Sequence, residues 1–157
     1  MYVELKNINK TYGSYQASRN VNLGIEKGKL IGLLGPSGSG KTTILRMIAG
    51  LETPDSGEVI IDGKVVNDVP ASQRGIGFVF QNYNLVPILN VYENIILPIE
   101  LDGNRPDKGY IDNIITLLGL EKKLTSMPNN LSGGQQQRVA IARALATKPA
   151  IILADVN

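Results

Sequence analysis

A glycine-rich segment carries the residues whose types and spacing point most directly to chemistry. It fits the pattern G-x-x-x-x-G-K-[ST] at every fixed position. The segment reads Gly35-Pro36-Ser37-Gly38-Ser39-Gly40-Lys41-Thr42 and continues with Thr43. Peptide N–H groups of a tight loop and of the first turn of a following helix can surround an anion, and glycine permits their close approach. We therefore expect a nucleotide phosphate site here, the alternative being a glycine-rich turn with a surface lysine.

Two side chains suit the charge and the metal ion that accompany nucleotide phosphates. Lys41 supplies a positive charge, and the hydroxyl of Thr42 is a hard oxygen ligand for Mg²⁺. Asp155 ends the apolar run 151–154, and enzymes with this loop hold Mg²⁺ with the loop hydroxyl and such an aspartate. The alternative for Asp155 is an ordinary turn that follows a strand.

Composition removes several kinds of chemistry. The chain has 157 residues, a length typical of one domain or part of one, and contains no histidine and no cysteine. Histidine bases, thiolate nucleophiles and metal sites built from either residue are therefore excluded. A net charge of +2 does not suggest a nucleic-acid-coating surface. No apolar run approaches the ~18 residues that cross a bilayer, and the N-terminus does not resemble a secretory signal, so we expect a cytoplasmic protein without direct membrane insertion.

The elements expected around the loop are mainly strands. Alternation predicts a strand that includes Val3, Leu5 and Ile8, and further strands at 21–25 and 76–80. The apolar run 30–34 predicts a strand buried on both faces, followed by the loop and a helix over 42–49 that Gly50 ends. Asp62-Gly63 predicts a hairpin turn between 59–61 and 65–66.

The second half of the chain is mainly helical by pattern. Asn90 and Glu93 form a capping-box pattern for a helix that reaches Leu101. Isoleucines and leucine at helical spacing over 111–118 predict an amphipathic helix that Gly119 ends. Ser132 caps a further helix to about Thr147, and 151–153 is the last apolar strand. The expected class is α/β, with a mostly parallel sheet in a P-loop core, an N-terminal antiparallel β subdomain and a helical insertion.

The segment Leu131-Ser132-Gly133-Gly134-Gln135 together with the phosphate loop resembles the ATP-binding subunits of ABC transporters. The resemblance covers the whole chain and implies ATP and Mg²⁺ as cofactors. It implies that Tyr12 stacks on adenine, that Gln81 contacts the metal with Thr42 and Asp155, and that the signature meets the γ-phosphate held by a second subunit. Packing for Tyr12, an ordinary polar role for Gln81 and a simple helix cap at Ser132 are the alternatives.

The same resemblance implies partners and an organisation. It implies a second nucleotide-binding subunit and a transmembrane permease subunit, with this chain peripheral on the cytoplasmic face of the membrane and no nucleic acid bound. The chain 1–157 would be one incomplete nucleotide-binding domain, with the C-terminal part of the fold missing: 1–82 holds the β subdomain and loop core, 83–147 the helical subdomain, and 148–157 the aspartate strand. Segments 77–81, 84–87 and 153–155 and the pair Glu93-Asn94 look like the branch for macrolide export, lipoprotein release and antimicrobial-peptide export.

The sequence departs from the family directly after Asp155. The family has a glutamate there that activates water, whereas this chain has Val156, which cannot accept a proton. The family also has a later histidine that contacts the γ-phosphate, and this chain has none. We therefore expect a chain that binds Mg-ATP but hydrolyses it poorly, with no catalytic residue of its own, and a fragment that folds marginally. An inert fragment and a DNA-maintenance ATPase are the alternatives, although the latter would need long coiled coils or zinc cysteines that are absent.

Overall fold

The computed structural model describes residues 1–36, 38–80 and 82–155. Two compact units follow one another along the chain, Met1–Arg74 and Gly75–Asn157. The predicted residues Ser37, Gln81 and Val156 lie outside the described residues. No helix among the described residues is long and apolar enough to cross a membrane.

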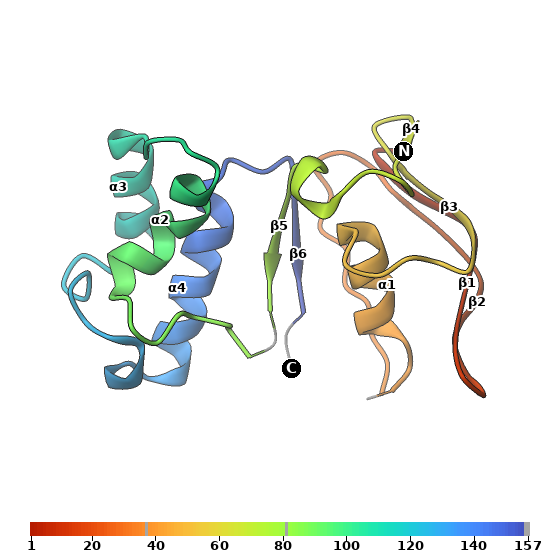
Figure 1. Cartoon of the computed structure of the whole chain (residues 1–157), viewed down its shortest axis with the longest axis horizontal. Helices are drawn as coiled ribbons and strands as arrows, with labels where there is room; N and C mark the ends of the chain where they lie inside the picture. The colour runs from red at the N-terminus through yellow and green to blue at the C-terminus, as the bar shows by residue number, and fades with distance from the viewer. Residues whose placement is uncertain (37, 81, 156–157) are drawn as a thin grey trace. The chain divides into compact units, whose positions relative to one another are not determined.

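The first unit is a four-stranded antiparallel sheet with one helix (Figure 1). The strand order is β2-β1-β3-β4. The elements are β1 (Val3–Tyr12), β2 (Tyr15–Ile25), α1 (Lys41–Ala49), β3 (Ser56–Ile61) and β4 (Lys64–Val65), followed by a short 3-10 helix at Ala71–Gln73. The last residues of α1, from Met47 to Ala49, are buried.

A bulge in β1 explains how Val3, Leu5 and Ile8 share one face although their spacing is not strictly alternating. The pairing of β1 with β2 shifts register between Leu5 and Ile8, and Asn7 within the shift has a φ of 51°. One extra residue turns the next side chain back to the same face. All three apolar side chains are buried as a result.

The hairpin between β3 and β4 forms as the sequence predicts. Asp62 and Gly63 both have positive φ, 50° and 77°, the combination that a type I′ turn needs. Val66 lies just beyond β4, but its N–H still donates to the Val59 carbonyl at 2.8 Å. A local turn of this kind depends on two residues, so the sequence alone predicts it well.

The expected strand at 30–34 is wrong for this structure. Residues 29–36 have no regular secondary structure, and Leu30 and Leu34 are 98% and 97% exposed. An apolar run becomes a buried strand only where neighbouring strands take its hydrogen bonds. In this unit the four strands pair with one another, and none of them pairs with 30–34.

The second unit combines a parallel strand pair with a helical layer. It contains β5 (Ile76–Val79), α2 (Val91–Leu101), α3 (Lys108–Leu117), α4 (Gly133–Ala146) and β6 (Ile151–Ala154), with a 3-10 helix at Pro128–Asn130. β5 and β6 run parallel from the pair Ile76 and Ile151 to the pair Val79 and Ala154. Figure 1 shows α2, α3 and α4 lying together. They enclose a core that includes Ile95, Ile111 and Val139.

The strand β5 packs closely against α4. Val79 shares a small core with Ala140 and Ala144 of the helix. A Cβ on Gly77 would lie 2.7 Å from the Ala144 carbonyl oxygen, so only glycine allows this approach. The antiparallel sheet, the parallel pair and the helical layer together give the predicted mixed α/β class.

Candidate functional site

The glycine-rich loop ends at the N-terminus of α1. Gly38 and Gly40 have φ values of 82° and 92°, the left-handed region that glycine tolerates best. Gly40 is the N-cap, and the Ile44 N–H donates to its carbonyl at 3.1 Å, the first hydrogen bond of the helix. Peptide N–H groups of a first helical turn have no intrahelical acceptor, so this end of α1 can receive an anion.

The loop lies directly against β2. A Cβ on Gly40 would overlap the backbone carbonyl of Ala17, so a larger residue would push the loop away from the strand. Tyr15, which also lies in β2, donates a hydrogen bond from its hydroxyl to the Gly38 carbonyl of the loop. These contacts hold the loop in a compact turn before α1.

Lys41 folds back over the loop. Its ammonium group donates to the Gly35 carbonyl, to the Pro36 carbonyl at 2.9 Å and to the Ser39 hydroxyl at 3.3 Å. All of these acceptors are neutral, and a phosphate oxygen is a stronger partner for an ammonium group. An arriving phosphate can therefore replace them, and the loop fits a phosphate by its shape and its charge.

Tyr12 ends β1 and contacts α1. Its hydroxyl donates to Glu52 Oε2 at 3.0 Å and is hydrogen-bonded to the side chain of Thr43. Burial, followed by the hydrogen bond to Glu52, raises the pKa of Tyr12 above its ordinary value. Tyr12 as a whole remains 42% exposed beside the helix that the phosphate loop begins. This position is compatible with the predicted contact to a base.

Lys10 and Asp55 complete the group of side chains around Tyr12. The Lys10 ammonium lies 3.2 Å from Glu52 Oε1 and 3.3 Å from Asp55 Oδ1. Burial alone would lower the pKa of Lys10, but the hydrogen bonds and attraction from both carboxylates outweigh it and raise the pKa. The hydrogen bond from Tyr12 lowers the pKa of Glu52, and the backbone N–H of Thr11 lowers that of Asp55. No sequence pattern predicts this network, because its members are about forty residues apart.

The predicted metal ligands belong to different elements. Thr42 is the second residue of α1, and Asp155 directly follows β6, where its N–H donates to the Val79 carbonyl at 2.9 Å. No group of three or more acidic, histidine or cysteine side chains among the described residues could hold a metal alone. A hydroxyl and one carboxylate suit Mg²⁺ when phosphate oxygens supply further ligands. The shared role of Thr42 and Asp155 stays a prediction.

The predicted signature forms the start of α4. Ser132 is the N-cap, its hydroxyl accepts from the Gln135 N–H at 3.2 Å, and the Gln135 side chain accepts from the Ser132 N–H at 2.9 Å. Gly133 and Gly134 follow the cap as the first residues of the helix. A Cβ on Gly134 would meet nothing within 4 Å, so the backbone there is open to a ligand. The capped helix is confirmed, whereas a phosphate contact at this end stays a prediction.

Arg143, on the same helix, was also missed. Its guanidinium donates to the carbonyl oxygens of Tyr83 at 2.7 Å and Asn84 at 2.9 Å. Both of these residues have positive φ, 61° and 55°. Two successive left-handed residues that are not glycine are costly, and Arg143 holds them in place.

Comparison with known proteins agrees with this geometry. The family model described as "ABC transporter" matches residues 18–156. A probable sulfate/thiosulfate import ATP-binding protein CysA of Chlorella vulgaris is 49% identical over 157 residues, which cover 99% of this chain and 66% of that protein. The spermidine/putrescine import ATP-binding protein PotA of Thermotoga maritima is 44% identical over 155 residues, which cover 98% of this chain and 42% of that protein.

A solved structure gives the same result at the level of the fold. The ATP-binding cassette MJ0796, in a dimeric post-hydrolysis state bound to ADP and Pi, is 45% identical with a TM-score of 0.87. The match covers 98% of this chain and 73% of that one. This chain spans between about two fifths and two thirds of the length of the two curated relatives.

The fold and the loop define the class as a P-loop NTPase with an antiparallel β sheet, a parallel strand pair and a helical layer. Within that class, the chain belongs to the ABC transporter family and has its ATP-binding-domain fold.

The predicted export branch is not supported. The two curated relatives above are named as import proteins. Two of the residues that suggested export, Glu93 and Asn94, have structural roles. Asn94 is fully buried and bonds the backbone of 86–90, and Glu93 completes the helix cap with Asn90.

Proposed function

We propose that this chain is the ATP-binding part of an ABC transporter that couples nucleotide binding to import. The observation that carries the proposal is the loop against β2, where Gly40 turns the backbone into α1 and Lys41 holds its ammonium group over neutral carbonyls. Segment 35–43 would bind the phosphates, Tyr12 the adenine, and Thr42, Gln81 and Asp155 the Mg²⁺ ion. The bound ion would neutralise phosphate charge.

The direction of transport in this proposal rests on the named relatives. One is named for sulfate and thiosulfate, which are anions, and another for spermidine and putrescine, which are cations. Their identities to this chain, 49% and 44%, are similar. We therefore assign the choice of solute to a transmembrane partner, with this chain on the cytoplasmic face of the membrane.

A second copy would complete the nucleotide site. The open backbone at the start of α4, with Ser132, Gly133, Gly134 and Gln135, would meet the γ-phosphate held by the loop of the other copy. The dimeric state of the solved cassette supports this arrangement. Val156 stands where the family has its water-activating glutamate, so we propose that the chain binds Mg-ATP but hydrolyses it slowly.

A binding titration tests the proposal. We expect Mg-ATP to bind the parent protein and Lys41→Ala to weaken it at least tenfold, because the variant loses the charge over the loop. Lys64→Ala, at an exposed position of β4, is the matched control and should bind like the parent. Equal affinity of Lys41→Ala and Lys64→Ala would show that the nucleotide does not use the loop. Phosphate release at the rate of a relative with the glutamate would refute slow hydrolysis.

A further inference from the structure

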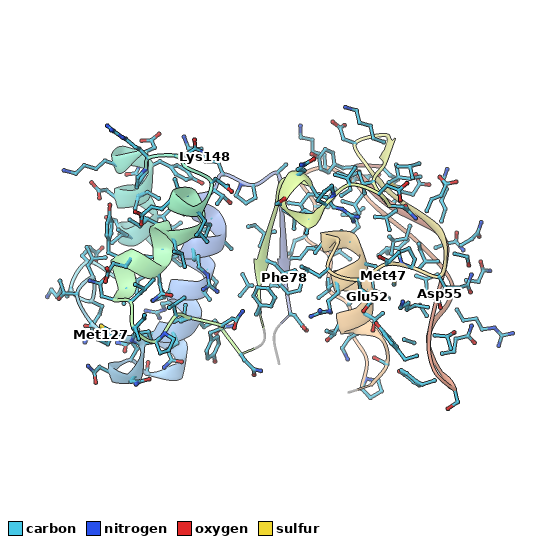
Figure 2. All side chains as sticks on the ribbon, in the orientation of Figure 1. Met47, Glu52, Asp55, Phe78, Met127 and Lys148 are labelled. Carbon is cyan, nitrogen blue, oxygen red and sulfur yellow. The ribbon has the colours of Figure 1, made fainter. Side chains whose placement is uncertain are left out.

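Four side chains form a closed network between the end of β1 and the segment after α1: Lys10, Tyr12, Glu52 and Asp55. Glu52 accepts a hydrogen bond from the Tyr12 hydroxyl at 3.0 Å and forms an ion pair with Lys10 at 3.2 Å. Asp55 pairs with Lys10 at 3.3 Å and accepts from the Thr11 N–H at 2.7 Å. Figure 2 labels Glu52 and Asp55 close to α1 and the first strands. Each charged group in the network thus has an opposite charge beside it.

The Lys10 ammonium also covers one face of the tyrosine. It lies over the Tyr12 ring, 5.3 Å from the centroid. Only 13% of the Lys10 side chain is exposed, so the two carboxylates and the ring fix its position. A cation at this distance is attracted to the face of an aromatic ring. The face of Tyr12 that Lys10 covers is therefore not available for stacking.

Hydrogen bonds to the hydroxyl of Tyr12 restrict the orientation of the ring further. Glu52 and Thr43 hold the oxygen, and Thr43 belongs to the first turn of α1. The ring is therefore tied to the helix that the phosphate loop begins, yet Tyr12 as a whole stays 42% exposed. A ring held at its oxygen and on one face presents its other face in a defined position.

We propose that Lys10 and Glu52, supported by Asp55, are positioning residues that hold Tyr12 so that its second face receives the aromatic base of a nucleoside triphosphate. This inference rests on the proposed function, since it requires phosphates in the loop. A ring that is already ordered loses little conformational entropy when the base arrives, so the network raises affinity without touching the nucleotide. It acts only on ligands that carry an aromatic base.

The test compares ATP with inorganic tripolyphosphate, which has the phosphates but no base. Affinities are measured by calorimetry in Mg²⁺ for the parent, Glu52→Ala, Glu52→Gln and the control Glu58→Ala, which changes an exposed carboxylate on β3. We expect Glu52→Ala to weaken ATP about three- to tenfold, the scale of an aromatic contact, and to leave tripolyphosphate within twofold. Glu52→Gln keeps an acceptor for Tyr12 but no charge for Lys10. Its affinity for ATP should therefore lie between those of the parent and of Glu52→Ala. Glu58→Ala should bind both ligands like the parent.

A double-mutant cycle separates positioning from a general structural effect. In the Tyr12→Ala background, we expect Glu52→Ala to cause no further loss of ATP affinity, because the group it positions is gone. An additional loss there, or an equal loss of tripolyphosphate and ATP in Glu52→Ala, would overturn the inference. Parent protein that binds both ligands equally tightly would also overturn it while leaving the phosphate site standing. Failure of the parent to bind either ligand would remove the proposed function as well.

Discussion

The backbone carbonyl of Ala17 in β2 fills the space that a side chain on Gly40 would need. Because Gly40 also has a φ of 92°, two independent causes require glycine at the cap of α1. The strand thereby determines where the loop turns into the helix. The position of the candidate phosphate site is thus set by a contact between segments more than twenty residues apart in sequence.

The first prediction concerns Gly40 itself. Gly40→Ala should lower the free energy of unfolding by about 2 kcal/mol or more, because a left-handed alanine costs ~1–2 kcal/mol and the overlap with Ala17 adds to it. Gly109→Ala in α3 is the matched control, since a Cβ there meets only Asp107 at 3.9 Å. The control should gain about 0.5–1 kcal/mol from helix propensity. Urea unfolding measures both, and a neutral Gly40→Ala would contradict the role of the contact.

The second prediction concerns Asn94, a fully buried side chain in α2. Its amide donates to the carbonyls of Val86, Leu89 and Asn90, and its oxygen accepts from the Val86 N–H at 2.8 Å. Asn94→Leu leaves these buried backbone groups without partners and should cost about 2–4 kcal/mol. Asn113→Leu, at an exposed position of α3, should change stability by less than about 0.5 kcal/mol. Equal denaturant midpoints for Asn94→Leu and Asn113→Leu would contradict the structural role of Asn94.

The third prediction concerns Arg143 and the two left-handed residues that it holds. Arg143→Met keeps much of the apolar stem but loses both donors to Tyr83 and Asn84, so the chain after β5 should open more often. We expect faster amide hydrogen exchange over 83–90, with the exchange of α1 unchanged. Arg138→Met, on the same helix, is the control. Unchanged exchange over 83–90 would show that the loop keeps its conformation without the guanidinium.

The fourth prediction concerns pH and the network around Tyr12. The folded pKa values of Glu52 and Asp55 are lowered, so their stabilisation is present above their unfolded pKa values near 4 and is lost as the pH falls through the folded values. Lys10 has a raised pKa, so its contribution is lost at the alkaline end, as the pH rises through its folded value above 10.5. The double variant Glu52→Gln/Asp55→Asn should therefore show a flatter dependence of stability on pH below 5. Parallel acid profiles of variant and parent would contradict the assignment.

Local sequence signals predicted much of the structure. The capping box at Asn90, the helix cap at Ser132 and the Asp62-Gly63 turn each depend on residues within one helical turn or less, and all of them form. The prediction of a strand at 30–34 was wrong because a strand needs a neighbouring strand to pair with. The local sequence does not show whether such a partner is present. The register shift beside Asn7 and the full length of β2 also depend on strand pairing.

The same difference between local and long-range contacts applies to the candidate site. The loop from Gly35 to Thr42 was recognisable because its chemistry requires a fixed order of residues in one short segment. The network around Tyr12 joins β1 to residues about forty positions later, so no spacing pattern predicts it. The signal that could have found Glu52 and Asp55 is weak, namely two carboxylates in the turn-forming segment after α1.

The last prediction separates the two roles of Ser132. Ser132→Ala removes the acceptor of the Gln135 N–H and should cost about 1 kcal/mol of stability. Ser132→Asp restores a good N-cap, so its unfolding free energy should return close to that of the parent. Its carboxylate, however, repels an incoming phosphate at the helix end. If the start of α4 meets the γ-phosphate of a second copy, Ser132→Asp should stay stable yet fail to dimerise in Mg-ATP, which analytical ultracentrifugation detects. ATP-dependent dimers of Ser132→Asp at the parent's concentration would limit this serine to the helix cap.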